Sequence, residues 1–355
     1  MKILHTSDLH LDSPLTTRLD SKKVRERKAE LILSFKRLAE SARREGAEAF
    51  IIAGDLFDSE RVGKRTLKNA IDIISAYPEI SFFYLSGNHE RAALSGSCLQ
   101  LPDNLRLFGS DWTYFKLGNV NFIGKCDTDK DMFSSLRLNK DETNILVLHG
   151  ELRDRSDELG VIGIKDAEEL DLDYIALGHY HSYSKTEISR RCDAVYSGTP
   201  EGRGFDEAGD CGYVIIEAGA GKVTHRFVKS AMRTLRICEI DVTDVESDLS
   251  LIFKIEAMLK GLPREDLIRI KLVGARELGR SYSPETILSS ISRSYYYIEI
   301  KDETRVKISP DDYKNDVSLK GEFIRGVLKD DSLSEKEKDA IIALGIEVLI
   351  EEAEG

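Results

Sequence analysis

The histidines of this chain are concentrated in one kind of position. Five of the seven follow closely on a short apolar run and lie beside Asp, Asn or Gly, namely His10, His89, His149, His179 and His181. The same places supply Asp8, Asp55 and Asn88. Nitrogen and oxygen ligands in this mixture suit manganese, iron or zinc, and contain too much nitrogen for a pure magnesium or calcium site. The residue types therefore predict a metal centre.

The spacing of these residues supports that prediction. In an extended chain the side chains at i and i+2 point the same way, so Asp8 and His10 can reach one metal cluster. A single pair of this kind is weak evidence, because a lone histidine near a strand end is usually structural. The ordered series DxH, GDxxD, GNHE, HG and GHxH, which spans residues 8–181, is far more specific. A metal ion bound by such residues lowers the pKa of a bound water and so supplies a nucleophile.

The elements that position these residues are expected to be buried strands. Apolar runs precede the clusters at residues 3–5, 49–53, 82–85, 145–148 and 174–177. Helical patterns lie between them, most clearly at 24–44 and 64–77. This alternation predicts an α/β sheet with ligand residues at the carboxyl ends of the strands. Turn signals within 104–126 and 185–229 indicate β-hairpins of a second sheet, so we expect two packed sheets with helices outside.

The ligand-type clusters stop near residue 232, which predicts a domain boundary. Residues 1–232 would form the catalytic domain, 233–302 a small α/β module, and 303–355 a charged helical segment. In the final helix, Ile341, Leu344 and Val348 form one apolar stripe. That stripe can dock a partner or pack on the protein itself.

The composition limits the class of protein. A formal net charge of −12 argues against a surface that is basic all over, although local basic patches remain compatible with nucleic acid. No stretch approaches the ~18 apolar residues of a membrane span. The opening MKILHTSD lacks the apolar segment of a secretory signal. We therefore expect a cytoplasmic protein without a membrane partner.

The ordered motifs resemble those of the calcineurin-like metallophosphoesterase superfamily. Within it the chain is similar to the SbcD-type DNA-repair exonucleases, particularly their YhaO-like branch. That similarity rests on the opening segment 5–14, on Tyr196-Ser197-Gly198-Thr199-Pro200, and on an α/β module in the place of the family's capping domain. The motifs cover about residues 1–230. The resemblance implies a four-layer αββα sandwich with a small α/β capping domain and a C-terminal helical tail.

The resemblance also assigns roles to the motif residues. It makes Asp8, His10 and His181 ligands of one metal and Asn88, His149 and His179 ligands of the other, with Asp55 as the bridge. His89 would act on the scissile phosphate and the leaving group, oriented by the carboxylate of Asp58. Two alternatives remain open: Asp58 as a simple helix cap, and Asp12 as either a partner of the ligand-bearing loops or an ordinary turn residue.

These roles predict a manganese-dependent DNA nuclease of DNA repair with two divalent metal ions, for which iron, zinc or magnesium could substitute. The family resemblance further implies DNA as substrate, an SMC-like ATPase as partner and a homodimer. One alternative is a phosphodiesterase or phosphatase that acts on small molecules through the same metal centre. A less favoured alternative is a metal-bearing scaffold without catalytic activity.

Overall fold

The protein divides into two compact units. The computed structural model describes residues 1–15, 17–87, 90, 93–94, 99–156, 158–219, 223–276, 282–291, 295–307 and 316–354. The first unit is Met1–Leu235 and the second is Arg236–Gly355. The predicted division of the second unit at residues 302 and 303 stays a prediction. Among the residues that the structure describes, no helix has the length and apolarity needed to span a bilayer.

The first sheet of the first unit has six strands in the order β14-β13-β1-β2-β3-β4. Their bounds are Lys2–Thr6 for β1, Ala49–Ala53 for β2, Ser81–Leu85 for β3, Leu105–Leu107 for β4, Gly212–Glu217 for β13 and Thr224–Lys229 for β14. Strands β1 to β4 run parallel, whereas β13 is antiparallel to both β1 and β14. The carboxyl ends of β1, β2 and β3 therefore meet at one edge.

The second sheet also has six strands, in the order β11-β12-β10-β7-β6-β5. Their bounds are Thr113–Leu117 for β5, Val120–Gly124 for β6, Thr143–His149 for β7, Tyr174–Gly178 for β10, Ser184–Glu187 for β11 and Asp193–Tyr196 for β12. The central strands β7 and β10 are parallel, with His149 opposite Gly178. A short parallel pair, β8 (Glu151–Arg153) and β9 (Val161–Gly163), lies outside the two sheets.

The distribution of strands between the sheets differs from the sequence-based expectation. The turn signals place the hairpin of β13 and β14 in the second sheet, yet it joins the first through the pairing of β13 with β1. Conversely, β7 and β10 carry ligand motifs but belong to the second sheet. The reason is that strand partners are chosen by long-range packing: Lys2 lies opposite Glu217, a pairing for which the chain carries no local signal.

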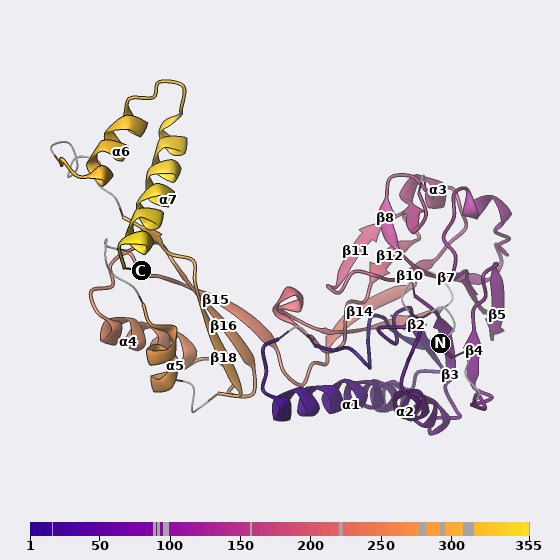
Figure 1. Ribbon diagram of the computed structural model, residues 1–355. Helices are drawn as coiled ribbons and strands as arrows, with labels where there is room; N and C mark the ends of the chain where they lie inside the picture. Colours follow the sequence, from indigo (N-terminus) through magenta and orange to yellow (C-terminus); the bar gives the residue numbers. More distant parts are fainter. Residues whose placement is uncertain are drawn as a thin grey trace. The chain divides into compact units, whose positions relative to one another are not determined.

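In the first unit the two sheets lie face to face with helices outside them, which gives four layers (Figure 1). Side chains alternate between neighbouring layers along each strand. On β2, Phe50 and Ile52 pack against helices α1 (Ser21–Glu45) and α2 (Lys64–Ser75). Ile51, from the other face of the same strand, packs between the two sheets. The outer face of the second sheet is covered by the short elements η1 (Met132–Ser135) and α3 (Ile164–Glu168). The predicted αββα sandwich is therefore confirmed.

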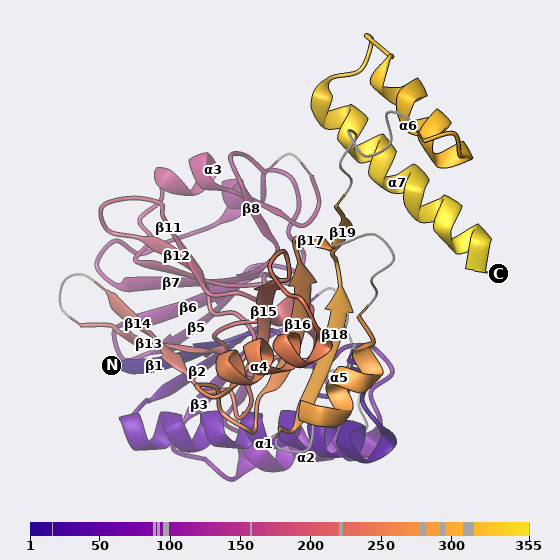
Figure 2. The ribbon, with the colours of Figure 1, turned by 90° about the vertical axis from the view of Figure 1, so that its left-hand side faces the viewer.

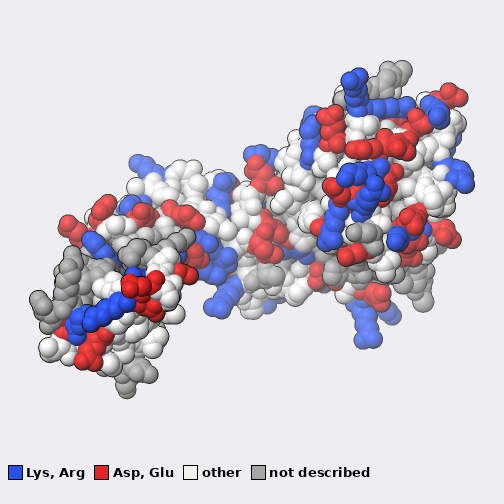
Figure 3. Space-filling view, turned by 90° about the horizontal axis from the view of Figure 1, so that it is seen from above, with Lys and Arg blue, Asp and Glu red and all other residues white. Residues whose placement is uncertain are grey.

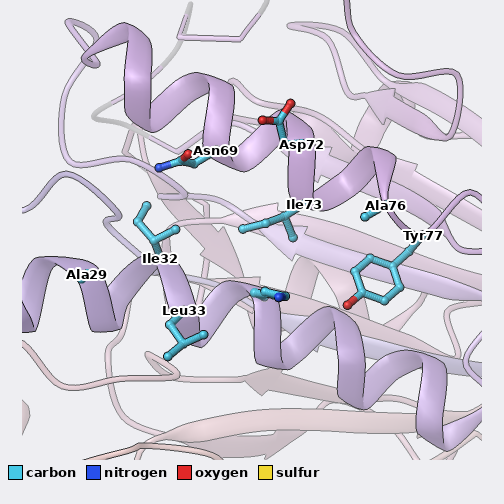
Figure 4. A pocket seen from close by; sticks show the side chains of 9 residues that line it. Ala29, Ile32, Leu33, Asn69, Asp72, Ile73, Ala76 and Tyr77 are labelled. Carbon is cyan, nitrogen blue, oxygen red and sulfur yellow. The ribbon is translucent and has the colours of Figure 1, made fainter.

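Helix α1 begins three residues before the predicted start at residue 24 and ends within one residue of the predicted end at residue 44. The Asp20 side chain accepts hydrogen bonds from the amides of Lys22 and Lys23 at the first turn. Gly46 ends the helix in the left-handed region at a φ of 70°, a position that favours glycine. Between α1 and α2 lies a groove lined by the exposed Leu33 and the buried Tyr77, among other residues (Figure 4). Its lining residues belong to the outer helical layer and include none of the predicted metal ligands.

The second unit contains a three-stranded sheet in the order β15-β16-β18, with helices α4 and α5 packed on it (Figure 2). The bounds are Leu235–Asp241 for β15, Asp248–Leu259 for α4, Leu267–Val273 for β16, Pro284–Ile291 for α5 and Tyr297–Asp302 for β18. Strands and helices alternate along this part of the chain, as expected of an α/β module. The short strands Ala275–Arg276 (β17) and Arg305–Val306 (β19) pair in parallel.

The C-terminal part of this unit is a helical hairpin of α6 (Leu319–Leu328) and α7 (Glu335–Glu354). The two helices pack through Ile324, Ile342 and Ile346. The predicted stripe of Ile341, Leu344 and Val348 lies on α7 beside the residues of this contact. Its side chains remain 38%, 66% and 49% exposed. Because the internal contact uses Ile342 and Ile346, the stripe is available to other surfaces.

Candidate metal centre

The two sheets bring their ligand-bearing loops together by main-chain hydrogen bonds. The amides of Asp8 and His10 donate to the carbonyls of Gly54 and Asp55, each at 3.0 Å, so the loops after β1 and β2 lie side by side. In the second sheet, the amide of Gly150 donates to the carbonyl of Gly178 at 3.2 Å. These bonds fix the backbone from which the predicted ligands project.

Glycine is required at two points where a ligand approaches the main chain. A Cβ on Gly87 would lie 1.8 Å from Oδ1 of Asp55, and a Cβ on Gly54 would lie 2.1 Å from Nδ1 of His149. Gly54 also has a φ of 94°. The close packing that these glycines permit explains their place in the motifs.

Several predicted ligands have positive backbone φ angles, which residues other than glycine rarely adopt. Among the described residues, positive φ angles occur at Asp8 (54°), His10 (44°), Asp55 (50°) and His179 (113°). Each such residue costs on the order of 1–3 kcal/mol and persists only where the surrounding structure imposes it. Leu15 and Asp131 also have positive φ angles, so four of the six described non-glycine residues with such angles are predicted ligands, a clustering typical of functional sites.

The side chains of these loops converge on two groups that could each hold a metal ion. One is Asp8, His10 and His181, the other is Asp8, Asp55 and His149, and within each group the ligand atoms lie within 4.8 Å of one another. Oδ2 of Asp55 lies 3.6 Å from Nε2 of His10 and 3.4 Å from Nε2 of His149. Asp55 thus stands between a histidine of each group. Buried carboxylates facing imidazole nitrogens fit divalent cations well.

A hydrogen-bond acceptor or a carboxylate lies against the second ring nitrogen of three histidines. Nδ1 of His149 lies 3.0 Å from the carbonyl oxygen of Ala53. Nδ1 of His181 lies 2.8 Å from Oε1 of Glu207, and Nδ1 of His10 lies 2.8 Å from Oδ1 of Asp58. In each case Nε2 faces the group of ligands, the orientation expected of a metal-binding imidazole.

The charges of the centre shift the pKa values of its members. Burial opposes protonation of His149, but the hydrogen bond to Asp55 and the charges of Asp8 and Asp55 outweigh it and raise the pKa to about 9. The hydrogen bond to Glu207 raises the pKa of His181. Burial disfavours the charged form of Glu207, yet its hydrogen bonds to His181 and Arg203 lower its pKa to about 2. The cluster therefore attracts positive charge.

Glu90 supports the loop that carries Asp55. Its fully buried carboxylate accepts hydrogen bonds from the amides of Leu56 at 2.8 Å and Phe57 at 2.6 Å. Burial and then the charge of Asp55 raise its pKa to about 8. The sequence places Glu90 beside the ligands without assigning it a role, and the structure makes it an anchor of the loop rather than a member of the two ligand groups.

The remaining predicted site residues either form hydrogen bonds with the ligand-bearing loops or lie outside the described residues. Asn88 and His89 fall outside the described part of the chain. The amide of His179 donates to the carboxylate of Asp8 at 3.2 Å. Asp12 accepts from the amide of Asp58 at 2.7 Å, which makes it a partner of the loop after β2.

Two further residues of the site, Arg203 and Glu207, were not predicted from the sequence. They contact His181 and follow the predicted Tyr196–Pro200 segment. The charged, glycine-containing stretch 201–207 gives no local signal that separates these two residues from solvent-exposed charges. A charged pair there needs buried partners, and the histidine of the preceding motif supplies one.

Comparison with known proteins agrees with this geometry. Residues 1–183 match the family model described as calcineurin-like phosphoesterase. The chain is 24% identical over 277 residues to the uncharacterized metallophosphoesterase YhaO of Bacillus subtilis, with 72% of this chain and 67% of the relative covered. It is 25% identical to the DNA double-strand break repair protein Mre11 of Methanopyrus kandleri, over 97% of this chain and 86% of the relative.

A solved structure with a similar course of the chain is TT1561 of Thermus thermophilus, at a TM-score of 0.42 and 13% identity over 64% of this chain and 98% of that one. The family match spans more than half of the chain and contains Asp8, His10, Asp55, His149 and His181, the residues of the two groups that could hold a metal ion. The chain belongs to the calcineurin-like phosphoesterase family and is a metal-dependent hydrolase of phosphate esters.

Proposed function

We propose that this protein is a manganese-dependent DNA nuclease of DNA repair that hydrolyses phosphodiester bonds at a two-metal centre. The observation that carries the proposal is the buried cluster of aspartates and histidines. It occurs in a chain that is similar over 97% of its length to a protein named for DNA double-strand break repair. A resemblance that includes the second unit favours the nuclease over a phosphoesterase that consists of the catalytic domain alone.

In this proposal, Asp8, His10 and His181 hold one cation, Asn88, His149 and His179 hold the other, and Asp55 bridges them. The position of Asp55 between His10 and His149 supports the bridging role. The mixed nitrogen and oxygen donors suit manganese, iron or zinc better than magnesium, and the resemblance to the SbcD-type nucleases selects manganese among them. When bound, two divalent cations lower the pKa of water and stabilise the charge on the phosphate oxygens.

His89 is proposed to donate a proton to the leaving oxygen, for which an imidazole with a pKa near neutrality is suited. Asp58 is proposed to stabilise the protonated form of His89 and to orient its ring toward the leaving group. Since Oδ1 of Asp58 lies 2.8 Å from Nδ1 of His10, the interaction with His89 would use Oδ2.

The competing function is a phosphodiesterase or phosphatase that acts on small molecules. The net charge of −12 favours it, because DNA binding relies on basic surface. In the face shown in Figure 3, basic and acidic side chains interleave over both units. The surface charge thus leaves both substrates possible, and only an assay separates them.

The decisive experiment compares cleavage of labelled single- and double-stranded DNA with cleavage of bis-p-nitrophenyl phosphate, with and without Mn²⁺. We expect manganese-dependent cleavage of DNA by the wild type. His89→Ala should lower the rate by roughly 10²–10⁴ while Mn²⁺ binding is retained. His225→Gln, a histidine outside the two ligand groups, serves as the matched control. Cleavage of the small diester alone would favour the competing function, and cleavage of neither substrate would favour a scaffold.

We also propose that an SMC-like ATPase docks on the apolar face of the α6–α7 hairpin. Leu319, Phe323, Ile341, Leu344 and Val348 line a groove there, and Leu319 and Leu344 are 68% and 66% exposed. Leu344→Asp should abolish co-purification of the ATPase, whereas Leu249→Asp should not, since Leu249 is 60% exposed on α4 and lies outside the groove. Light scattering of the purified chain tests the proposed homodimer.

A further inference from the structure

Two histidines of one ligand group are held in the same way. Nδ1 of His181 meets Glu207 and Nδ1 of His10 meets Asp58, both at 2.8 Å. The opposite nitrogens face the acidic ligands, with Nε2 of His181 3.8 Å from Oδ1 of Asp8. A carboxylate on the second nitrogen fixes the ring and makes the imidazole a stronger donor to metal.

A single guanidinium joins these two carboxylates. Nε of Arg203 donates to Oε1 of Glu207 at 3.0 Å, and Nη2 donates to the same carboxylate. Nη1 of Arg203 donates to Oδ1 of Asp58 at 3.3 Å. The side chains of Arg203 and Glu207 are only 9% and 2% exposed. Since the planar fork has separate donors for each carboxylate, Arg203 can hold both partners at once, which a lysine cannot do.

The other ligand group is built differently. Its His149 is oriented by the main-chain carbonyl of Ala53 at 3.0 Å, a neutral acceptor. Residues Glu207, Asp58 and Arg203 therefore bear on the group of Asp8, His10 and His181. Removal of their charges should weaken one metal site and spare the other.

We propose that Arg203 is a positioning residue that holds Glu207 against His181 and Asp58 against His10, and so sets the metal affinity of the Asp8, His10 and His181 site. The inference rests on the two-metal function proposed above. It adds Arg203 and Glu207, which lie outside the family's ordered motifs. It also explains why the positively charged side chain of Arg203 is buried close to a centre that must itself bind metal cations.

The test measures metal binding to the metal-free, full-length protein rather than its activity. The variants are Arg203→Lys, which keeps the positive charge but lacks the planar guanidinium, and Glu207→Gln, which keeps the shape of the side chain but loses its negative charge. The matched control is Arg191→Lys, because Arg191 makes a similar two-point contact with the buried Asp173 at 2.6 and 3.0 Å. Calorimetry gives the number and affinity of Mn²⁺ ions, and electron paramagnetic resonance distinguishes single from coupled Mn²⁺. Thermal unfolding without metal verifies that each variant is folded.

We expect two Mn²⁺ ions per wild-type chain. In Arg203→Lys and Glu207→Gln, one ion should bind about 10–100-fold more weakly. The other should be nearly unchanged, so that the signal of single Mn²⁺ dominates at limiting metal. Arg191→Lys should bind both ions as the wild type does. Unchanged affinities in both variants, or an equal loss at both sites, would overturn this inference alone. A wild type that binds fewer than two ions would instead overturn the two-metal function, and this inference with it.

Discussion

A methyl group at Gly54 should damage the metal centre more than it damages the fold. The Cβ of Gly54→Ala would lie 2.1 Å from Nδ1 and 2.6 Å from Cγ of His149, so the imidazole must move. The positive φ of 94° adds a penalty of about 1–2 kcal/mol for a residue with a side chain. Overpacking against a buried ring adds about 1–3 kcal/mol. The expected destabilisation is the sum, roughly 2–5 kcal/mol.

The chain offers a control that has the same backbone strain without the clash. Gly46 has a φ of 70°, and a Cβ there would meet nothing within 4 Å. Gly46→Ala should therefore destabilise by only about 1–2 kcal/mol. At roughly 2–4 °C per kcal/mol for a unit of this size, Gly54→Ala should unfold about 2–12 °C below Gly46→Ala.

Calorimetry of Mn²⁺ binding completes the comparison. Gly54→Ala should lose affinity for the ion that His149 holds, whereas Gly46→Ala should bind both ions as the wild type does. If Gly54→Ala bound Mn²⁺ as tightly as Gly46→Ala, His149 would not be a ligand held in place by the missing Cβ, and the reasoning would fail.

Three further predictions concern stability. Arg27→Met should destabilise the first unit by about 3–5 kcal/mol in urea unfolding, because it leaves the fully buried carboxylate of Glu201 without the guanidinium 2.8 Å away; a loss below about 1 kcal/mol would contradict this. Burial lowers the pKa of His5 to about 3, so the unfolded chain binds one more proton than the native state between pH 6.5 and about 3. Stability should then fall by about 1.4 kcal/mol per pH unit as the pH drops through that range, and His5→Asn should remove this slope in urea unfolding at pH 7 and pH 5. Finally, Mn²⁺ at 100 times its dissociation constant should stabilise the first unit by about 2.7 kcal/mol, and excess EDTA should abolish that shift in scanning calorimetry.

The sequence was sufficient to predict the strands that carry the ligands, because apolar runs followed by glycine and polar residues are local patterns. Strand β2 has the predicted bounds Ala49–Ala53, and Gly46 ends α1 where its conformational freedom indicated. The assignment of β13 and β14 to the first sheet could not be predicted in this way. It depends on the packing of apolar faces from segments that lie more than two hundred residues apart in the chain.

The same division applies to the metal centre. Asp8, Asp55 and His149 could be found because their residue types and the adjoining glycines are specific for metal sites. Arg203 and Glu207 could not, because a charged pair in sequence is usually solvated and acquires its meaning only from burial beside His181. Groups expected to bind the metal are thus visible in sequence patterns, whereas groups that orient them depend on tertiary packing.

The strain at the centre gives a physical reason for this arrangement. Asp8, His10 and Asp55 all have positive φ angles, and both carboxylates are almost fully buried. Without cations, unfavourable backbone conformations and repulsion between buried charges both act against folding. The apolar layers on both faces of the first sheet, together with main-chain bonds such as that from Asp8 to Gly54, offset this penalty. The loops are consequently held in a metal-ready conformation by the fold, so cation binding relieves charge repulsion without having to order the backbone.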